Sequence, residues 1–150
     1  MDTNTNFELI PYIGAGLLKF GLKPIDVETL YGVPDSTSIN FLKQKIEFRS
    51  FMNIAYSEGE EELVHIGFGR QMTGVKYKNI FLFEESDKDV LQKLIKEDQE
   101  PFIYLGFIVL LNLGMTLTGF HDDDISQKAV TLFPRGAWDK RLPKLKPFTL

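Results

Sequence analysis

The spacing of hydrophobic positions changes several times along the chain, and each change predicts a new element. Residues 7–21 are typical of an extended lead-in with turns at its glycines, and residues 43–56 alternate as a strand does. One side of that alternation carries Ile46, Phe48, Ser50, Met52 and Ile54, and the other carries Lys45, Glu47, Arg49, Phe51 and Asn53. A charged turn and a second apolar segment, residues 62–69, follow, so we expect an antiparallel hairpin.

Two segments have helical signals. In residues 22–35, Pro24 suits a first helical turn, and Gly32 followed by Pro34 ends the helix. In residues 84–102, Ser86 is a plausible N-cap and Pro101 is the stop. The apolar stripe of the second helix consists of Val90, Leu91, Leu94 and Ile95.

The remaining apolar segments predict strands at residues 74–83, 102–114, 115–120 and 127–136. Because residues 102–114 are almost entirely apolar, we expect a central strand covered on both faces. The order is helix then strands, twice. We therefore predict an α+β fold in one compact domain, residues 1–150, with half-repeats at 7–72 and 73–142 and both helices on one face of an antiparallel sheet.

Composition narrows the class of protein. The chain has no cysteine, so disulfides and thiolate metal sites are excluded. Its start lacks the pattern of a signal peptide, and its longest apolar stretch is about half of the roughly 20 residues that cross a membrane. A net charge of −4 argues against a nucleic-acid partner. We expect a cytoplasmic protein with no nucleic-acid or membrane partner.

Charges are unevenly distributed along the chain. One acidic cluster consists of Glu58, Glu60, Glu61 and Glu62, another of residues 84–100, and a third of Asp122, Asp123 and Asp124. The C-terminal segment is basic, with Arg135, Lys140, Arg141, Lys144 and Lys146. These charges fit either solvated loops and a basic tail or an acidic face that attracts a basic partner.

A metal site could be suspected at His121 and the three aspartates that follow it. Neighbouring residues on an extended chain point to alternate sides, and the D-x-D-x-D-G calcium pattern is missing because Ile125 and Ser126 come next. Aspartates commonly serve turns through their own backbone, so we expect a turn rather than a metal site. No cofactor is predicted.

Motifs for nucleophilic catalysis and for phosphate binding are also missing from the sequence. We therefore expect a protein that is not an enzyme. The alternative is an enzyme or small-ligand-binding protein with a pocket between the two halves, for which a cleft lined by His65 or His121 would be a sign.

An interaction surface is the third interpretation. Trp138, Phe133, Arg135 and Phe51 are of residue types enriched at binding hot spots, and Phe51 falls on the polar side of its predicted strand. We expect Asp122, Asp123 and Asp124 to meet basic groups of a partner while Trp138 and Phe133 supply apolar anchors. The predicted partner-binding residues are Asp122, Asp123, Asp124, Phe133, Arg135, Trp138 and Phe51.

Two motifs carry a resemblance to a known class. "GAGLLKFGLKPIDVETLYGVPD" resembles the opening of small bacterial immunity proteins from polymorphic-toxin loci, and "GMTLTGFHDDDISQKAVTLFPRGAWD" resembles their closing half. The order of elements is similar to the β-lactamase inhibitor protein fold, although this chain lacks the cysteines of that secreted inhibitor. The resemblance implies a cytoplasmic, non-catalytic protein that binds and neutralises a cognate toxin.

Overall fold

The computed structural model describes residues 1–59 and 61–150, so Glu60 of the first acidic cluster lies outside the described residues. Two α-helices, α1 (Pro24–Tyr31) and α2 (Asp87–Asp98), and two 3-10 turns, η1 (Ile125–Gln127) and η2 (Asp139–Lys144), accompany the strands. The strands are β1 (Phe7–Ile10), β2 (Gly14–Ala15), β3 (Leu18–Lys19), β4 (Ser36–Ile39), β5 (Lys45–Arg49), β6 (Met52–Tyr56), β7 (Leu63–Gly69), β8 (Val75–Tyr77), β9 (Ile80–Phe81), β10 (Phe102–Tyr104), β11 (Phe107–Leu110), β12 (Met115–Thr118), β13 (Ala129–Leu132) and β14 (Lys146–Pro147).

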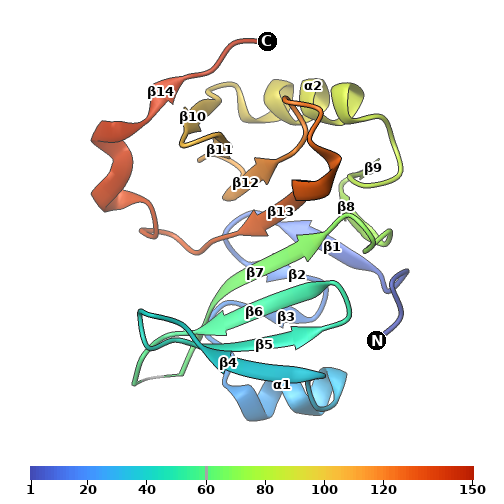
Figure 1. The fold of residues 1–150 in the computed structure, drawn as a ribbon, viewed down its shortest axis with the longest axis vertical. Helices are drawn as coiled ribbons and strands as arrows, with labels where there is room; N and C mark the ends of the chain where they lie inside the picture. The colour runs from blue at the N-terminus through green and yellow to red at the C-terminus, as the bar shows by residue number, and fades with distance from the viewer. Residues whose placement is uncertain (60) are drawn as a thin grey trace.

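The larger sheet has nine strands in the order β14-β10-β11-β12-β13-β7-β6-β5-β4, and every neighbouring pair is antiparallel (Figure 1). The two halves of the chain meet at its centre, where β13 pairs with β7. There Val130 lies opposite Phe68, and Leu132 lies opposite Ile66. The sheet is therefore continuous across both halves.

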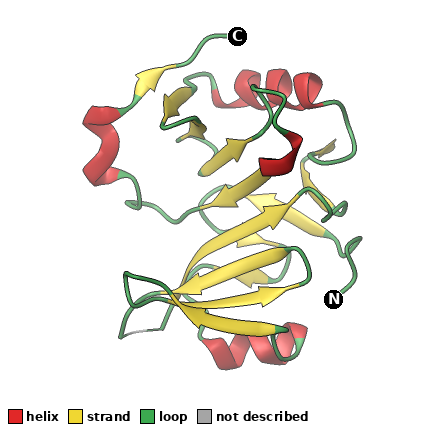
Figure 2. Cartoon of the chain, viewed as in Figure 1, coloured by secondary structure: helices red, strands yellow, loops and turns green. Residues whose placement is uncertain are grey.

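A smaller sheet of five short strands, in the order β3-β2-β1-β8-β9, also joins the halves. Its central pair is parallel, with Phe7 opposite Val75. One hydrophobic cluster draws on both sheets and both α-helices, from Phe7 and Val27 to Leu94 and Leu132. The helices and the small sheet thus cover one face of the large sheet, and the α+β class is confirmed (Figure 2).

Both α-helices begin where local signals place them. Pro24 is the first residue of α1, and the Ser86 hydroxyl accepts a 3.2 Å hydrogen bond from the Asp89 amide at the start of α2. Leu91 and Leu94 of the predicted stripe are buried. Helix α2 ends at Asp98, three residues before Pro101. In the short helix α1 only Val27 is buried.

Three of the predicted strands are broken by turns. Residues 74–83 form β8 and β9, an antiparallel pair joined by a turn in which Lys78 has a φ of 53°. Residues 43–56 form β5 and β6, joined at Ser50, whose φ is 52°. Residues 102–114 form β10, β11 and a final turn, because Leu105 and Gly106 both adopt positive φ. Such a pair of residues makes the tight turn of a hairpin. The prediction of one central strand at residues 102–114 is therefore wrong, and Leu105 is 79% exposed at the tip of a hairpin.

The alternation in β5 has the opposite orientation to the usual one. Glu47 and Arg49 are buried at 3% and 2% exposure, whereas Phe48 between them is 38% exposed. Glu47 lies opposite Ile54 across the β5–β6 pair, so its side chain points to the face that the helices cover. The charged side of this strand therefore faces the core.

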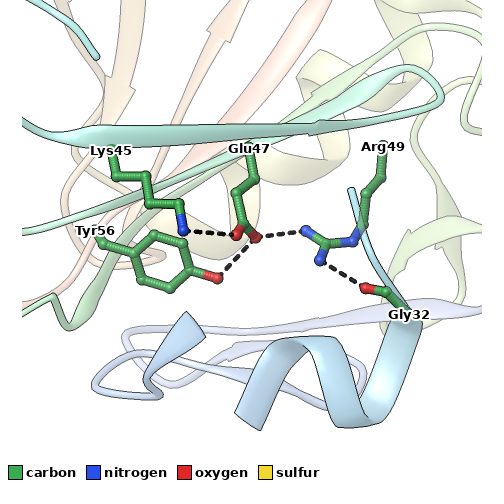
Figure 3. Close-up of polar contacts among 5 residues, drawn as sticks. All are labelled: Gly32, Lys45, Glu47, Arg49 and Tyr56. Carbon is green, nitrogen blue, oxygen red and sulfur yellow. Dashed lines mark hydrogen bonds and ion pairs between the residues drawn. The ribbon is translucent and has the colours of Figure 1, made fainter. Parts of the chain in front are cut away.

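A cluster of polar side chains offsets the cost of burying these two charges through hydrogen bonds and ion pairs (Figure 3). Glu47 Oε1 accepts hydrogen bonds from Arg49 Nη1 at 2.7 Å and from the Tyr56 hydroxyl at 2.9 Å. Lys45 Nζ lies 3.7 Å from the other carboxylate oxygen. Arg49 Nη2 donates to the carbonyl of Gly32 at the end of α1, 2.9 Å away, and so ties the helix to the sheet. Burial raises the pKa of the Tyr56 hydroxyl above its ordinary value, and the hydrogen bond to Glu47 adds to the effect.

A second buried acid holds the other half together. Asp98 is 1% exposed at the end of α2, and its carboxylate accepts hydrogen bonds from the backbone amides of Asn112 at 2.8 Å and Leu113 at 3.1 Å. Burial raises the pKa of this carboxyl, and the backbone donors partly oppose the shift.

Within the described residues, none of the helices has the length and apolar character needed to cross a membrane.

Candidate functional site

The face of the large sheet turned away from the helices carries small side chains at its centre. Gly67 of β7 lies opposite Thr131 of β13, which in turn lies opposite Thr116 of β12. On the same face, Thr118 lies opposite Ala129, and His65 lies opposite Ala55. Because paired residues point to the same side of a sheet, these positions leave a shallow depression where β12, β13 and β7 meet.

This depression is the floor of a groove of about 710 Å³. Its lining includes Val64 and His65 from the first half and Thr116, Thr118 and Thr131 from the second. Phe107, Phe133 and Trp138 form its aromatic side, and Leu42, Gln44 and Ser57 approach from the loops beside β5 and β6. The groove therefore crosses the junction of the two halves, and the covered core lies on the other side of the sheet.

The wall of the groove is positively charged. Arg135 and Arg141 both line it, whereas no Asp or Glu is among its lining residues in the part of the chain that the structure describes. The Arg141 guanidinium carbon lies 4.1 Å from the centre of the Trp138 ring, and that of Arg135 lies 4.4 Å from the centre of Tyr12. Stacking on aromatic rings holds a guanidinium in place and leaves its N–H groups free to donate at the edges.

His65 is the titratable group on the groove floor. Its Nε2 lies 2.9 Å from Asn53 Oδ1 of the adjacent strand β6. Burial lowers the pKa of the imidazole below its ordinary value, so His65 is neutral at pH 7. The positive charge of the groove consequently comes from its two arginines.

The aromatic wall is built by a second, smaller hydrophobic cluster. Trp138 packs edge-on against Tyr104, with ring centres 5.5 Å apart, and lies 6.0 Å from the ring of Phe133. Val109 of β11 is buried beneath both rings, so the cluster attaches the chain after β13 to the open face of the sheet. Trp138 and Phe133 are only 7% and 6% exposed. Both rings therefore support the wall from within and present only a small area to the groove, and their role as apolar anchors for a partner stays a prediction.

The predicted partner-binding residues fall into two groups at opposite ends of the strands. Phe51 lies in the β5–β6 turn, where its carbonyl accepts a hydrogen bond from the Gly69 amide at the end of β7. Gly69 pairs with Ala129, the first residue of β13, so the aspartate loop before β13 lies at this same end. Phe133, Arg135 and Trp138 follow the other end of β13. The expected single surface is therefore divided.

The three aspartates are used by their own loop. The Asp122 carboxylate accepts a 3.2 Å hydrogen bond from the Asp124 amide, and the Asp124 carboxylate accepts one of 2.5 Å from the Ser126 hydroxyl. Asp123 adopts a φ of 58°, as a turn residue does. Across residues 1–59 and 61–150 there is no group of three or more His, Asp or Glu side chains arranged to hold a metal ion.

The groove residues missed in the sequence, above all Thr116, Thr118 and Thr131, have a local signal. They alternate with buried Met115, Leu117 and Leu132, so their orientation could be inferred. What could not be inferred was that β13 and β7, which come from different halves of the chain, are neighbours. Chemically, the arrangement offers a neutral, hydroxyl-bearing floor and a cationic wall, which suit binding through hydrogen bonds and ion pairs.

No protein-family model matches this chain, and neither a curated protein nor a solved structure matches it.

Proposed function

We propose that this protein is a non-catalytic binding protein of the cytoplasm that works as an immunity protein and blocks a cognate bacterial toxin. The observation that carries the proposal is the groove on the uncovered face of the large sheet. In most domains each apolar face of a large sheet is covered by other elements, and a face that is open to solvent is polar. This face instead combines small residues, aromatic rings and two stacked arginines around a hollow of about 710 Å³.

The charge of the groove specifies the partner further. Within the described residues, Arg135 and Arg141 form no ion pair with a carboxylate. Both can therefore donate hydrogen bonds to an acidic group of the partner. A guanidinium presents a planar set of donors that matches a carboxylate. The proposed contact is an acidic segment of the toxin lying across β13 and β7. Asp122, Asp123, Asp124 and Phe51 remain predicted contacts for a basic part of the partner at the other end of the strands.

The partner must be isolated before the contact can be measured. Tagged protein is purified from its native cells, and a polypeptide retained in near-stoichiometric amount is identified by mass spectrometry. The proposal requires that the retained polypeptide be toxic when expressed alone and harmless when co-expressed with this protein. Co-expression that leaves the toxicity unchanged would contradict it.

A charge-reversal pair then tests the groove itself. We expect Arg141→Glu to weaken binding of the retained partner about 30-fold or more, the effect of losing a hot spot worth about 2 kcal/mol. Lys140→Glu is the matched control, because it changes the net charge equally at an exposed neighbour that is not among the groove residues. Equal weakening by both variants would indicate long-range attraction only. Equal binding by both would remove the groove from the interface.

A second candidate function is favoured by the position of the groove between the halves. Its volume falls in the range of roughly 300–1,000 Å³ that is typical of small-molecule sites. Under this alternative the two arginines bind an acidic metabolite, and the protein is an enzyme or a small-ligand-binding protein. Native mass spectrometry of freshly purified protein separates the candidates, since a retained small molecule lost in Arg141→Glu supports the alternative.

A further inference from the structure

The two edges of the large sheet are built differently. Strand β14 forms one edge and carries Lys146 and Pro147, a cation and a residue without an amide hydrogen. Strand β4 forms the other edge, at the lower side of Figure 1. Its sequence is Ser-Thr-Ser-Ile, and all four residues are exposed. Proteins usually protect an open edge with lysine, proline or a covering segment, because free backbone groups there can pair with another strand. The β4 edge has neither lysine nor proline.

The hydrogen bonds at the end of this hairpin indicate which backbone groups are free. The Asn40 amide donates to the carbonyl of Gln44 at 3.1 Å, so this pair bonds across β4 and β5. Bonding pairs alternate along an antiparallel ladder. Ser36 and Ser38 therefore direct their N–H and C=O groups to β5, and Thr37 and Ile39 direct theirs outward from the sheet.

Exposed apolar side chains lie at both ends of the same strand. Val33 precedes β4 and is 71% exposed, and Ile39 at its end is also 71% exposed. In the turn that follows, Phe41 is 92% exposed and Leu42 is 55% exposed. A second strand of the same sequence, running antiparallel beside β4, would cover the apolar side chains at both ends of this edge.

We propose that β4 pairs with β4 of a second copy of this chain, antiparallel and about a twofold axis through Ser38. The outward groups require that Thr37 bond with Ile39 of the second copy, and the same bonds form again on the other side of the axis. The turn that carries Phe41 and Leu42 then lies beside the segment around Val33 of the second copy. The large sheets of the two copies become one continuous sheet.

Charge and symmetry favour a second copy over a longer assembly. No charged residue lies within β4, and the two Asp35 side chains would be separated by six residues along the ladder, so like charges do not oppose each other. Pairing of β4 with β14 would produce an open filament, but Pro147 and Lys146 oppose it. Pairing of β4 with itself uses the same surface on both copies and closes at a dimer.

Light scattering after size exclusion tests the dimer. At about 100 µM we expect twice the chain mass of 17.2 kDa. Thr37→Pro should give the monomer mass with an unchanged circular dichroism spectrum, because it removes an outward N–H and leaves the β4–β5 bonds in place. A wild-type monomer at this concentration, or a Thr37→Pro protein that remains a dimer, would overturn the proposal. The groove has its own test, the comparison of Arg141→Glu with Lys140→Glu, so failure of the dimer and failure of the proposed function can be told apart.

Cysteine cross-linking tests the twofold axis, since the chain has no cysteine of its own. Two Ser38 residues at the axis would have Cα atoms about 4.5 Å apart, within reach of a disulfide. Two Ser36 residues would be roughly 14 Å apart at four residues of offset, which is out of reach. We expect mild oxidation to link Ser38→Cys and to leave Ser36→Cys unlinked. Equal linking of both variants, or linking of Ser36→Cys alone, would overturn this pairing.

Discussion

Arg49 Nη1 donates a 2.7 Å hydrogen bond to Glu47 Oε1 within the covered layer of the sheet, where the two residues are 2% and 3% exposed. The residues are two positions apart on β5, so the pleat of the strand points both side chains to the same face. Each charge is buried only because the other is present. Loss of one partner leaves an ion in a region of low dielectric constant, where it is strongly disfavoured.

We predict that Arg49→Met lowers the free energy of unfolding by about 3–5 kcal/mol, because the Glu47 carboxylate then remains buried without its main partner. The double variant Glu47→Leu/Arg49→Met should recover most of this loss, since no buried charge is left unpaired and Lys45 is exposed enough to be hydrated. Urea denaturation with an unchanged m-value measures both effects. A double variant as unstable as the single one would indicate that the arginine acts by fixing α1 through Gly32.

The Tyr56 hydroxyl donates to the same carboxylate, and burial raises its pKa above the ordinary value of 10.0. The folded protein therefore retains this proton at pH values where the unfolded chain has lost it. Its contribution to stability is fully present below pH 10 and declines as the pH rises above 10. We expect Tyr56→Phe to be less stable at pH 8 by about 1–2 kcal/mol. The variant should also show a weaker fall in stability between pH 10 and 11.5, measured by urea denaturation at each pH.

His65 gives the opposite dependence on pH. Burial lowers the pKa of its imidazole below 6.5, so the unfolded chain binds a proton more readily than the folded protein does. Its contribution to stability is present above pH 6.5 and is lost as the pH falls through the lowered pKa. We predict that His65→Gln, which can still bond to Asn53, loses less stability than wild type between pH 7 and pH 5. NMR titration of the imidazole protons checks the direction directly, and a pKa above 6.5 would refute the prediction.

Trp138 is predicted to be a structural residue of the groove wall. Replacement of this buried ring by alanine should cost about 3–5 kcal/mol of stability, and Trp138→Phe should cost less. We expect Trp138→Ala to speed amide hydrogen exchange mainly in residues 139–148, because these lose their attachment to Tyr104 and Val109. Lys140→Ala, an exposed position in the same segment, is the control. Unchanged exchange in residues 139–148 of Trp138→Ala would show that other contacts hold this segment.

The elements determined by local chemistry could be predicted from the sequence. Pro24 and the Ser86 cap place the starts of both α-helices, and the stripe around Leu91 identifies the buried side of α2. The α+β class follows from the order of helical and alternating segments. Each of these features depends on residues within a few positions of one another, so no knowledge of distant contacts is needed.

Only the tertiary structure decided which side of β5 is buried and which strands meet beneath the groove. The alternation around Glu47 has two orientations, and the unusual one is stable because Arg49 and Tyr56, from β5 and from its neighbour β6, satisfy the buried carboxylate. In the same way, Thr131 forms a floor only because β13 pairs with β7 from the other half of the chain. Strand neighbours far apart in sequence are selected by the free energy of the whole core. The local pattern indicates which residues share a face of a strand, but it does not indicate which strands are its neighbours in the sheet.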